Sequence, residues 1–435
     1  MKKASFALLA LMMAVTSGCG ASKTTTDSAP AASTASNAST SPAPEKDITL
    51  TFWSTTQDLY ADMTKKFEAQ NPHIKIKADF MGDYDAMEQK VLAAVVAGNL
   101  PNVVQLGQRY GIPQVADSGK LIPIEQFMTD QEKQDVYPAL WDRFRYKDKL
   151  WTIPFNSSTP VLYYNKTMLD KAGLKAPSSW DELVAAAKKL TQDTNGDGKS
   201  DVWGFSSATD TPWYFQALVW DRGGAFLDPS GKPTVNSKAV VDTLKGYQDL
   251  VNVEKAMAPN QHKTAGEDFT AGKLAMMFWS GSSLKSFQKQ VGDKFEIGVA
   301  FLPSIQSRNV PIGGNSLGIF KSDKDTEAAA WKFVQFLTNA ENAAQTSMTS
   351  GYAPIRKTAA DQPQFKDLLG KDPLFKTIME QNQYLKANGI SPADAVIWNG
   401  LVTAQEKVEG DPMADPKALL DKLQADVESY LKGYK

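Results

Sequence analysis

Strand-like and helix-like periodicities alternate at the start of the folded part of the chain. Apolar side chains occupy every second position in residues 47–53, as in a half-buried strand. Helical spacing follows in residues 59–71, alternation returns in residues 73–80, and helical spacing returns in residues 84–98. Residues 102–107 form a third strand-like run. Because this β-α-β-α-β order requires crossover connections, it predicts a mostly parallel sheet covered by helices.

A second region repeats these signals. Residues 150–155 and 161–165 have strand character, and a third apolar segment lies at residues 313–320. A helix is predicted to begin at Ser179, because Glu182, three residues later, completes a capping box. The 435 residues are too many for one hydrophobic core, so two domains are expected.

Composition excludes some classes of function. The formal net charge of −2 predicts no basic surface for a nucleic acid or another polyanion. The chain has 10 tryptophans and 13 tyrosines but only 2 histidines. This bias favours binding by stacking and hydrogen bonding over acid–base catalysis by imidazole.

The first residues have the features of a secretory signal. In residues 1–18 two lysines precede an apolar stretch that is too short to span a membrane, and small residues follow it. Cys19 comes next and is the only cysteine. Lipidation of Cys19 after cleavage explains its position, although an ordinary signal with an incidental cysteine is the alternative. The flanks resemble the bacterial lipoprotein box, except that Thr16 replaces the usual aliphatic residue.

Cleavage before Cys19 gives a tethered extracellular protein. Loss of two of the 47 cationic residues leaves 45 against 49 anionic ones, a net charge of −4. Residues 19–46 consist largely of Ala, Ser, Thr and Pro and are predicted to be a flexible tether. The body is therefore expected outside the cytoplasm, anchored to the bacterial cell membrane by lipid.

A cluster of short polar side chains precedes a strand of the second region. Asn156, Ser157, Ser158 and Thr159 stand directly before a proline and an apolar run. In open α/β sheets, ligands bind beyond the carboxyl ends of strands. We therefore expect these side chains, in a connection between two strands of the second region, to face a cleft. A satisfied Asn/Ser turn is the alternative.

Four stretches of the body resemble extracellular solute-binding proteins of bacterial ABC importers, of the maltose-binding type (family 1). They are "YNKTMLDKAGLKAPSSWDEL", "FTAGKLAMMFWSG", "IGGNSLGIF" and "SGYAPIRK", and the resemblance extends over the body from Ile48 onward. It implies the α/β periplasmic-binding-protein type II fold, with two lobes, a hinge and a ligand cleft between them. The implied first lobe is residues 47–155 and 313–345, and the second is residues 156–312 and 346–435.

The resemblance also implies a function and a set of ligand contacts. It implies a monomer without catalytic residues that captures a solute by hinge closure and delivers it to an ABC permease. The stretch "PFNSSTPVLYYNK" is very like the corresponding segment of glycerol-3-phosphate-binding proteins. By resemblance, the ligand-contacting positions are Tyr84, Ser157, Ser158, Gly314 and Tyr352 and, more loosely, Trp213, Ser280 and Gly281. The full set of predicted ligand-binding residues also includes Gln108, Asn156, Gly313, Trp279 and Trp398.

Two departures bear on the ligand. Gln108 stands where the glycerol-3-phosphate-binding proteins have a glutamate, and Ala395 stands where they have a phosphate-pairing arginine. A guanidinium is the natural partner of a phosphate. A neutral polyol needs amides, hydroxyls and aromatic faces instead. The sequence therefore favours a sugar or oligosaccharide over glycerol-3-phosphate or a glycerophosphodiester.

Two further motifs bear on metal binding and on catalysis. The segment "DTNGDGKSD" has the odd-position spacing of a calcium loop, but Gly204 stands where the terminal glutamate is expected. A structural calcium ion and a plain Asx/Gly turn are the alternatives, and no cofactor is otherwise required. The candidate calcium ligands are Asp193, Asn195, Asp197, Lys199 through its backbone, and Asp201.

The second motif concerns a possible enzyme. "GNSLG" fits the G-x-S-x-G pattern of serine hydrolases. That fold requires a histidine after the serine, however, and no histidine follows Ser316. The alternative from another class is an anchored carbohydrate-active hydrolase that uses a pair of Asp or Glu residues.

Overall fold

A computed structural model describes residues 46–55, 60–107, 111–208, 211–387 and 389–434. Contacts between Cα atoms assign the chain from Lys46 to its end to one compact unit. Within the described residues, no helix has both the length and the apolar character that a membrane span requires. The predicted signal peptide, Cys19, the tether up to residue 45, and Gln108 lie outside the described residues.

The first sheet contains the predicted β-α-β-α-β unit. Strands β1 and β2 are parallel, as are β1 and β3, which confirms the predicted unit. The sheet as a whole is mixed rather than mostly parallel, because its other two strand pairs are antiparallel. Strand β12 runs antiparallel to both β3 and β6 and completes the sheet. The strand order is β2 (Ile74–Phe80), β1 (Ile48–Ser54), β3 (Val103–Gly107), β12 (Gly313–Ile319) and β6 (Ile153–Ser158).

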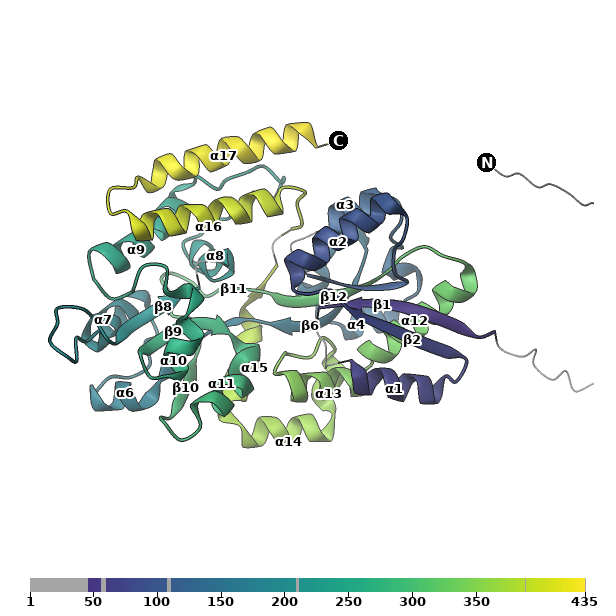
Figure 1. Cartoon of the computed structure of the whole chain (residues 1–435), viewed down its shortest axis with the longest axis horizontal. Coiled ribbons are helices and arrows are strands. Elements are labelled where there is room, and N and C mark those ends of the chain that lie inside the picture. Colours follow the sequence, from purple (N-terminus) through teal and green to yellow (C-terminus); the bar gives the residue numbers. More distant parts are fainter. Residues whose placement is uncertain (1–45, 56–59, 108–110, 209–210, 388, 435) are drawn as a thin grey trace, which may run out of the picture. The chain divides into compact units, whose positions relative to one another are not determined.

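Helices from both halves of the chain cover this sheet, and together they form the first lobe (Figure 1). This lobe also contains a small separate hairpin of β4 (Arg145–Tyr146) and β5 (Lys149–Leu150). Side chains such as Met87, Val91 and Leu106 are buried between the sheet and its helices. The helices are α1 (Ala61–Gln70), α2 (Tyr84–Ala97), α3 (Ile112–Asp117), α4 (Asp130–Asp135), α5 (Pro138–Arg143), α12 (Lys324–Thr338) and α13 (Ala340–Ser350).

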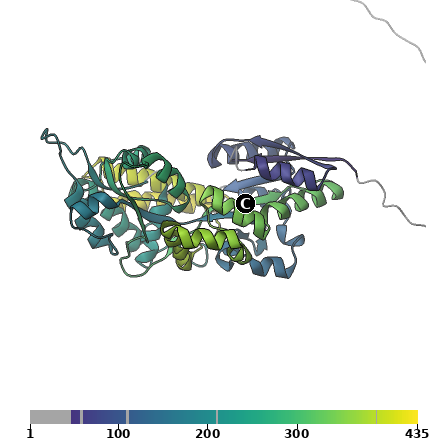
Figure 2. The same cartoon turned by 90° about the horizontal axis from the view of Figure 1, so that it is seen from below.

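The second sheet is mixed. Its order is β10 (Ile297–Ala300), β7 (Pro160–Asn165), β9 (Leu274–Ser280) and β8 (Trp203–Ser207), and only the β8–β9 pair is parallel. Helices pack around it to form the second lobe, as the perpendicular view also shows (Figure 2). The predicted capping box is present at the start of α7 (Trp180–Leu190), where Ser179 accepts a hydrogen bond from the Glu182 backbone N–H.

The remaining elements lie mainly with the second lobe or beside the junction. Strand β11 (Val310–Pro311) pairs with β13 (Leu385–Lys386). The helices are α6 (Lys166–Lys171), α7 (Trp180–Leu190), α8 (Pro212–Asp221), α9 (Lys238–Asn252), α10 (Ala265–Thr270), α11 (Leu284–Val291), α14 (Pro363–Lys371), α15 (Pro373–Gln381), α16 (Asp394–Gly410) and α17 (Pro416–Gly433).

Strand β6 corrects the prediction for the polar cluster. Asn156, Ser157 and Ser158 are not in a connection within the second region, because they pair with β12 in the first sheet. On the other side of β6, the Ser157 N–H donates to the Ala353 carbonyl (3.1 Å), and the Ala353 N–H donates back (2.7 Å). The ladder therefore continues beyond the implied lobe boundary at residue 155. Only Thr159 separates β6 from β7, so the chain crosses directly from one sheet to the other.

One buried acid in the second lobe gives a prediction about stability. Glu409 is 2% exposed, and its Oε2 accepts a hydrogen bond from the Asn260 N–H (2.8 Å). Burial, with a smaller contribution from Glu406, raises the pKa of Glu409 to about 7. Between its ordinary pKa and this value the folded state binds more protons than the unfolded state, so stability falls as pH rises through that window.

Glu409→Gln is therefore expected to remove this pH dependence. At pH 8 the variant should exceed the wild type in free energy of unfolding by about 1–3 kcal/mol, and the gap should shrink at pH 5. Urea unfolding at the two pH values measures the difference. Parallel pH profiles of the variant and the wild type would contradict this account.

Candidate functional site

Strands β6 and β12, called the crossing strands below, bring the predicted polar residues of β6 opposite the glycines of β12. Ser158 is opposite Gly313, and Ser157 is opposite Gly314. Gly314 has φ 104°, and a Cβ there would overlap the backbone oxygen of Asn156 and lie 2.7 Å from its Oδ1. Glycine is thus required for the two strands to approach this closely.

A network of side-chain hydrogen bonds extends from these strands toward the second lobe. Asn156 Oδ1 accepts from the Asn315 N–H (3.0 Å), and Asn315 Nδ2 donates to the Tyr84 hydroxyl (3.1 Å). Tyr84 in turn hydrogen-bonds with Tyr352, which also hydrogen-bonds with Ser282. Residues of the first lobe are thereby connected through Tyr352 to a turn of the second lobe.

Burial is the main reason why the pKa values of Tyr84 and Tyr352 are raised. Both hydroxyls therefore keep their protons at neutral pH. The network continues from Ser282 to Ser280, whose hydroxyl oxygens are 2.8 Å apart. Its members are all neutral hydroxyl and amide groups, so the network needs no counter-charge.

Tyr352→Phe removes one hydroxyl from this network while it retains the ring. We expect ligand affinity to fall about three- to tenfold, because the bonds to Tyr84 and Ser282 are both lost. Isothermal titration with the ligand found below measures the change. Tyr137→Phe, at a first-lobe tyrosine that is 37% exposed, is the control and should bind normally. Unchanged affinity in Tyr352→Phe would show that this network does not support binding.

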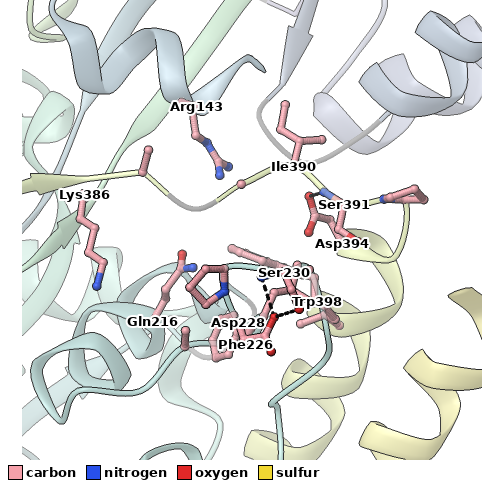
Figure 3. Close-up of a pocket in the computed structure, with 18 of the residues that line it drawn as sticks. Arg143, Gln216, Phe226, Asp228, Ser230, Lys386, Ile390, Ser391, Asp394 and Trp398 are labelled. Atoms are coloured by element: carbon pink, nitrogen blue, oxygen red, sulfur yellow. Dashed lines mark hydrogen bonds between the residues drawn. The ribbon is translucent and has the colours of Figure 1, made fainter. Parts of the chain in front are cut away.

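A cavity of about 840 Å³ lies beside the crossing strands (Figure 3). The first lobe contributes Arg143, Lys147 and Asp148 to its lining, and the second lobe contributes most of the rest. Trp213 connects it to the strands, because a Cβ on Gly313 would lie 2.6 Å from the Trp213 ring. The aromatic side chains of the lining are Trp213, Trp220, Phe226 and Trp398.

The charges that line the cavity are balanced. The cationic side chains are Arg143, Lys147 and Lys386, and the anionic ones are Asp148, Asp228 and Asp394. Arg143 is only 5% exposed, and Figure 3 shows its guanidinium directed into the cavity.

Two of the carboxylates accept hydrogen bonds from backbone N–H groups of their own loops. Asp228 accepts hydrogen bonds from the backbone N–H groups of Ser230 (2.8 Å) and Lys232 (3.0 Å). Asp394 accepts one from the Ser391 N–H (3.0 Å). These bonds give the two acids a local structural role in shaping the cavity wall.

The predicted ligand residues fall into four groups. Trp213 and Trp398 line the cavity, whereas Trp279 packs against Phe287 (ring centroids 6.0 Å apart) and is absent from the described lining. Gln108 lies outside the described residues. The others gather at the crossing strands or in the adjacent network: Tyr84, Asn156, Ser157, Ser158, Ser280, Gly281, Gly313, Gly314 and Tyr352.

Several residues of the site were not predicted. Asn315 lies inside the quoted stretch "IGGNSLGIF", so its neighbours could have indicated it. Arg143 carries no such signal, because only the folded chain brings α5 to a cavity formed largely by second-lobe residues.

The candidate calcium loop is held by its own hydrogen bonds. Asp193 accepts from the N–H groups of Gly196 (2.7 Å) and Gly198 (2.8 Å), and Asp201 Oδ2 accepts from the Thr194 N–H (2.8 Å). Among the described residues, no group of three or more His, Cys, Asp or Glu side chains is arranged to hold a metal ion. The calcium site remains a prediction.

Two α/β lobes, strands that cross between them and an adjoining cavity define a solute-binding protein of the periplasmic type II fold. Residues 62–377 match the family described as bacterial extracellular solute-binding protein. The match covers well over half of the chain, so the chain belongs to that family. This confirms the family predicted from the sequence and the expectation of a binding protein rather than an enzyme.

Two relatives and two solved structures illustrate the family. The maltotriose-binding protein of Pyrococcus abyssi (strain GE5 / Orsay) is 25% identical over 387 residues, which cover 86% of this chain and 80% of that protein. The sn-glycerol-3-phosphate-binding periplasmic protein UgpB of Escherichia coli (strain K12) is 28% identical over 343 residues, which cover 73% of this chain and 76% of that protein.

Both kinds of ligand recur among solved structures. The MalE domain of Bdellovibrio bacteriovorus bound to maltotriose has a TM-score of 0.77 at 23% identity and covers 88% of this chain and 100% of that one. UgpB of Mycobacterium tuberculosis in complex with glycerophosphocholine has a TM-score of 0.77 at 26% identity, with coverages of 88% and 98%. The fold is therefore common to sugar binders and glycerophosphodiester binders.

Proposed function

We propose that the chain is the extracellular, lipid-anchored binding protein of a carbohydrate ABC importer, and that its ligand is a sugar or oligosaccharide. The observation that carries this proposal is the cavity beside the crossing strands, with its aromatic walls and its equal numbers of cationic and anionic side chains. It is lined by residues of both lobes, so a ligand within it contacts both.

Size and chemistry support a neutral, hydroxyl-rich ligand. A volume of about 840 Å³ is in the range of small-molecule sites and is large enough for more than one sugar ring. Trp213 and Trp398 offer flat apolar faces to the C–H faces of sugar rings. Since three cationic and three anionic side chains balance, the lining has no net charge that selects for an anion.

Arg143 favours a second candidate, a glycerophosphodiester. The expected arginine is replaced by Ala395, but the Arg143 guanidinium enters the cavity from the first lobe. A guanidinium pairs well with a phosphate, and the aromatic side chains suit a quaternary ammonium group. Arg143 would then perform the recognition that the missing arginine performs elsewhere in the family.

Capture follows from the arrangement of the two lobes. The chain passes from the first sheet to the second at Thr159, and Ile312 alone separates β11, which pairs with β13, from β12 of the first sheet. Rotation about such short crossings moves the lobes as bodies. A ligand that contacts both lobes binds the closed state more tightly, so it shifts the population toward closure. The closed complex is the form that a permease would receive.

The anchor is proposed to be a lipid on Cys19, and residues 19–46 are proposed to tether the body to it. Fractionation of producing cells should place the wild-type chain with the membrane, whereas Cys19→Ser should be released or remain unprocessed. Mass spectrometry of the mature N-terminus checks the modification. An unmodified cysteine in a cleaved chain would contradict the anchor but not the binding function.

A thermal-shift panel tests the ligand. The full chain would be mixed with mono- and oligosaccharides, glycerol-3-phosphate and glycerophosphocholine. At a concentration of about 100 Kd, a ligand stabilises the folded state by roughly 2.7 kcal/mol, enough for a shift of several degrees. We expect a shift with a neutral saccharide. A shift with the phosphate compounds alone would select the second candidate, and Arg143→Gln should abolish it.

A further inference from the structure

The lobes also touch at the rim of the cavity, away from the crossing strands. Tyr434 follows α17, which packs on α16 and α9 of the second lobe. Asp117 is the last residue of α3, which packs on α2 in the first lobe. The Tyr434 hydroxyl donates a hydrogen bond to Asp117 Oδ2, with the two oxygens 3.3 Å apart. One side-chain contact thus joins elements of both lobes.

Two other side chains donate hydrogen bonds to the Asp117 carboxylate. Lys147 Nζ donates to its Oδ1 (2.7 Å), and the Tyr146 hydroxyl donates to its Oδ2 (2.8 Å). Burial alone would raise the pKa of Asp117, but the hydrogen bonds from Lys147 and Tyr146 outweigh it and hold this pKa below its usual value. Asp117 is therefore a charged acceptor at neutral pH, which strengthens the bond from Tyr434.

The hairpin that supplies these donors also lines the cavity. Lys147 (φ 47°) and Asp148 (φ 59°) form its turn, and both have positive φ, which is strained for residues other than glycine. Both belong to the cavity lining, as does Leu431, three residues before Tyr434. The contact between the lobes therefore stands at the cavity rim, whereas the crossing strands reach the cavity through Trp213.

We propose that Asp117, Tyr146, Lys147 and Tyr434 form a latch between the lobes at the rim of the cavity. The latch stabilises the lobe arrangement seen here, in which both lobes line the cavity, before the ligand arrives, so that less of the binding energy is needed to bring the lobes together. The effect on ligand affinity rests on the proposed function. The effect on the distance between the lobes does not, because the latch involves only residues of this chain.

Tyr434→Phe tests the latch with the loss of a single hydroxyl, and Asp117→Asn tests it from the other side. Tyr430→Phe is the matched control, since Tyr430 lies one turn earlier on α17 with its ring centroid 6.0 Å from that of Tyr434. Spin labels on cysteines at Val96 and Val253, which are 89% and 66% exposed, report the distance between the lobes. The full chain would carry Cys19→Ser so that only these sites are labelled.

We expect both latch variants to have a longer or broader distance distribution without ligand, and Tyr430→Phe to match the wild type. Affinity for the panel ligand should fall about three- to tenfold in both, mainly through faster dissociation. Circular dichroism and thermal melts check that each variant folds. Because the two substitutions are at different positions, the test remains possible if one variant fails to fold. Distances unchanged in both variants would overturn the latch, even if affinity falls. Failure of the wild type to bind any panel compound would instead overturn the proposed function.

Discussion

Gly314→Ala is expected to destabilise the protein by about 3 kcal/mol and to abolish ligand binding. The added Cβ would overlap the backbone oxygen of Asn156, and alanine is strained at the φ of 104° found here. Since both obstacles are backbone features, no side-chain rotation can relieve them. Strands β6 and β12 must separate, which displaces Asn315 and with it the hydrogen bond to Tyr84.

Urea unfolding measures the change in stability, and calorimetric titration measures the change in ligand affinity. The matched control is Gly370→Ala in α14, where an added Cβ meets nothing within 4 Å. That change should leave binding intact and should stabilise the helix by about 1 kcal/mol or less. If Gly314→Ala binds ligand as the wild type does, then the close approach of the two strands is not needed for the site.

Trp213→Ala is expected to weaken ligand binding by roughly 30-fold or more. Buried aromatic anchors in the centre of a site commonly contribute about 2 kcal/mol or more, and each 1.4 kcal/mol is tenfold in affinity. Trp213 lines the cavity and also fills the space over Gly313, so its loss removes a stacking face and loosens the contact with the crossing strand. Its indole N–H is buried and has no hydrogen-bond partner among the described residues.

A tryptophan of similar burial provides the control. Trp331 stacks on Phe127 in the first lobe (ring centroids 5.6 Å apart) and is not among the residues that line the cavity. Trp331→Ala should lower stability but leave affinity within about twofold. Equal losses of affinity in Trp213→Ala and Trp331→Ala would mean that the effect reflects stability alone. The same titration on Trp279→Ala decides whether that residue contacts the ligand as predicted.

The sequence predicted the parts of the fold that local patterns determine. The alternating run at residues 47–53 became β1, and the capping box at Ser179 became the start of α7, because each depends only on neighbouring residues. The sequence predicted the polar cluster in a connection of the second region, whereas the cluster belongs to a strand of the first sheet, because local patterns do not reveal which sheet a segment joins. The pairing of Ser157 with Ala353, almost 200 residues away, is a tertiary contact that no local pattern contains.

The residues of the site likewise divide into those that a sequence motif indicated and those that only the folded chain brings together. Gly314 and Tyr352 were predicted through motifs, and they lie at the crossing strands and in the adjacent network. Arg143 and the latch residues Asp117 and Tyr434 were missed. Their side chains act through contacts between segments far apart in the chain, and a lone charged or aromatic residue has no distinguishing local pattern.

The central claim is that the cavity beside the crossing strands binds a saccharide, and a crystal structure with the most stabilising saccharide of the panel tests it most directly. We predict a sugar ring stacked on Trp213 or Trp398, with hydroxyls that contact residues of both lobes. A saccharide bound outside this cavity would contradict the assignment of the site. A structure in which only a phosphate compound occupies the cavity, paired with Arg143, would contradict the assignment of the ligand.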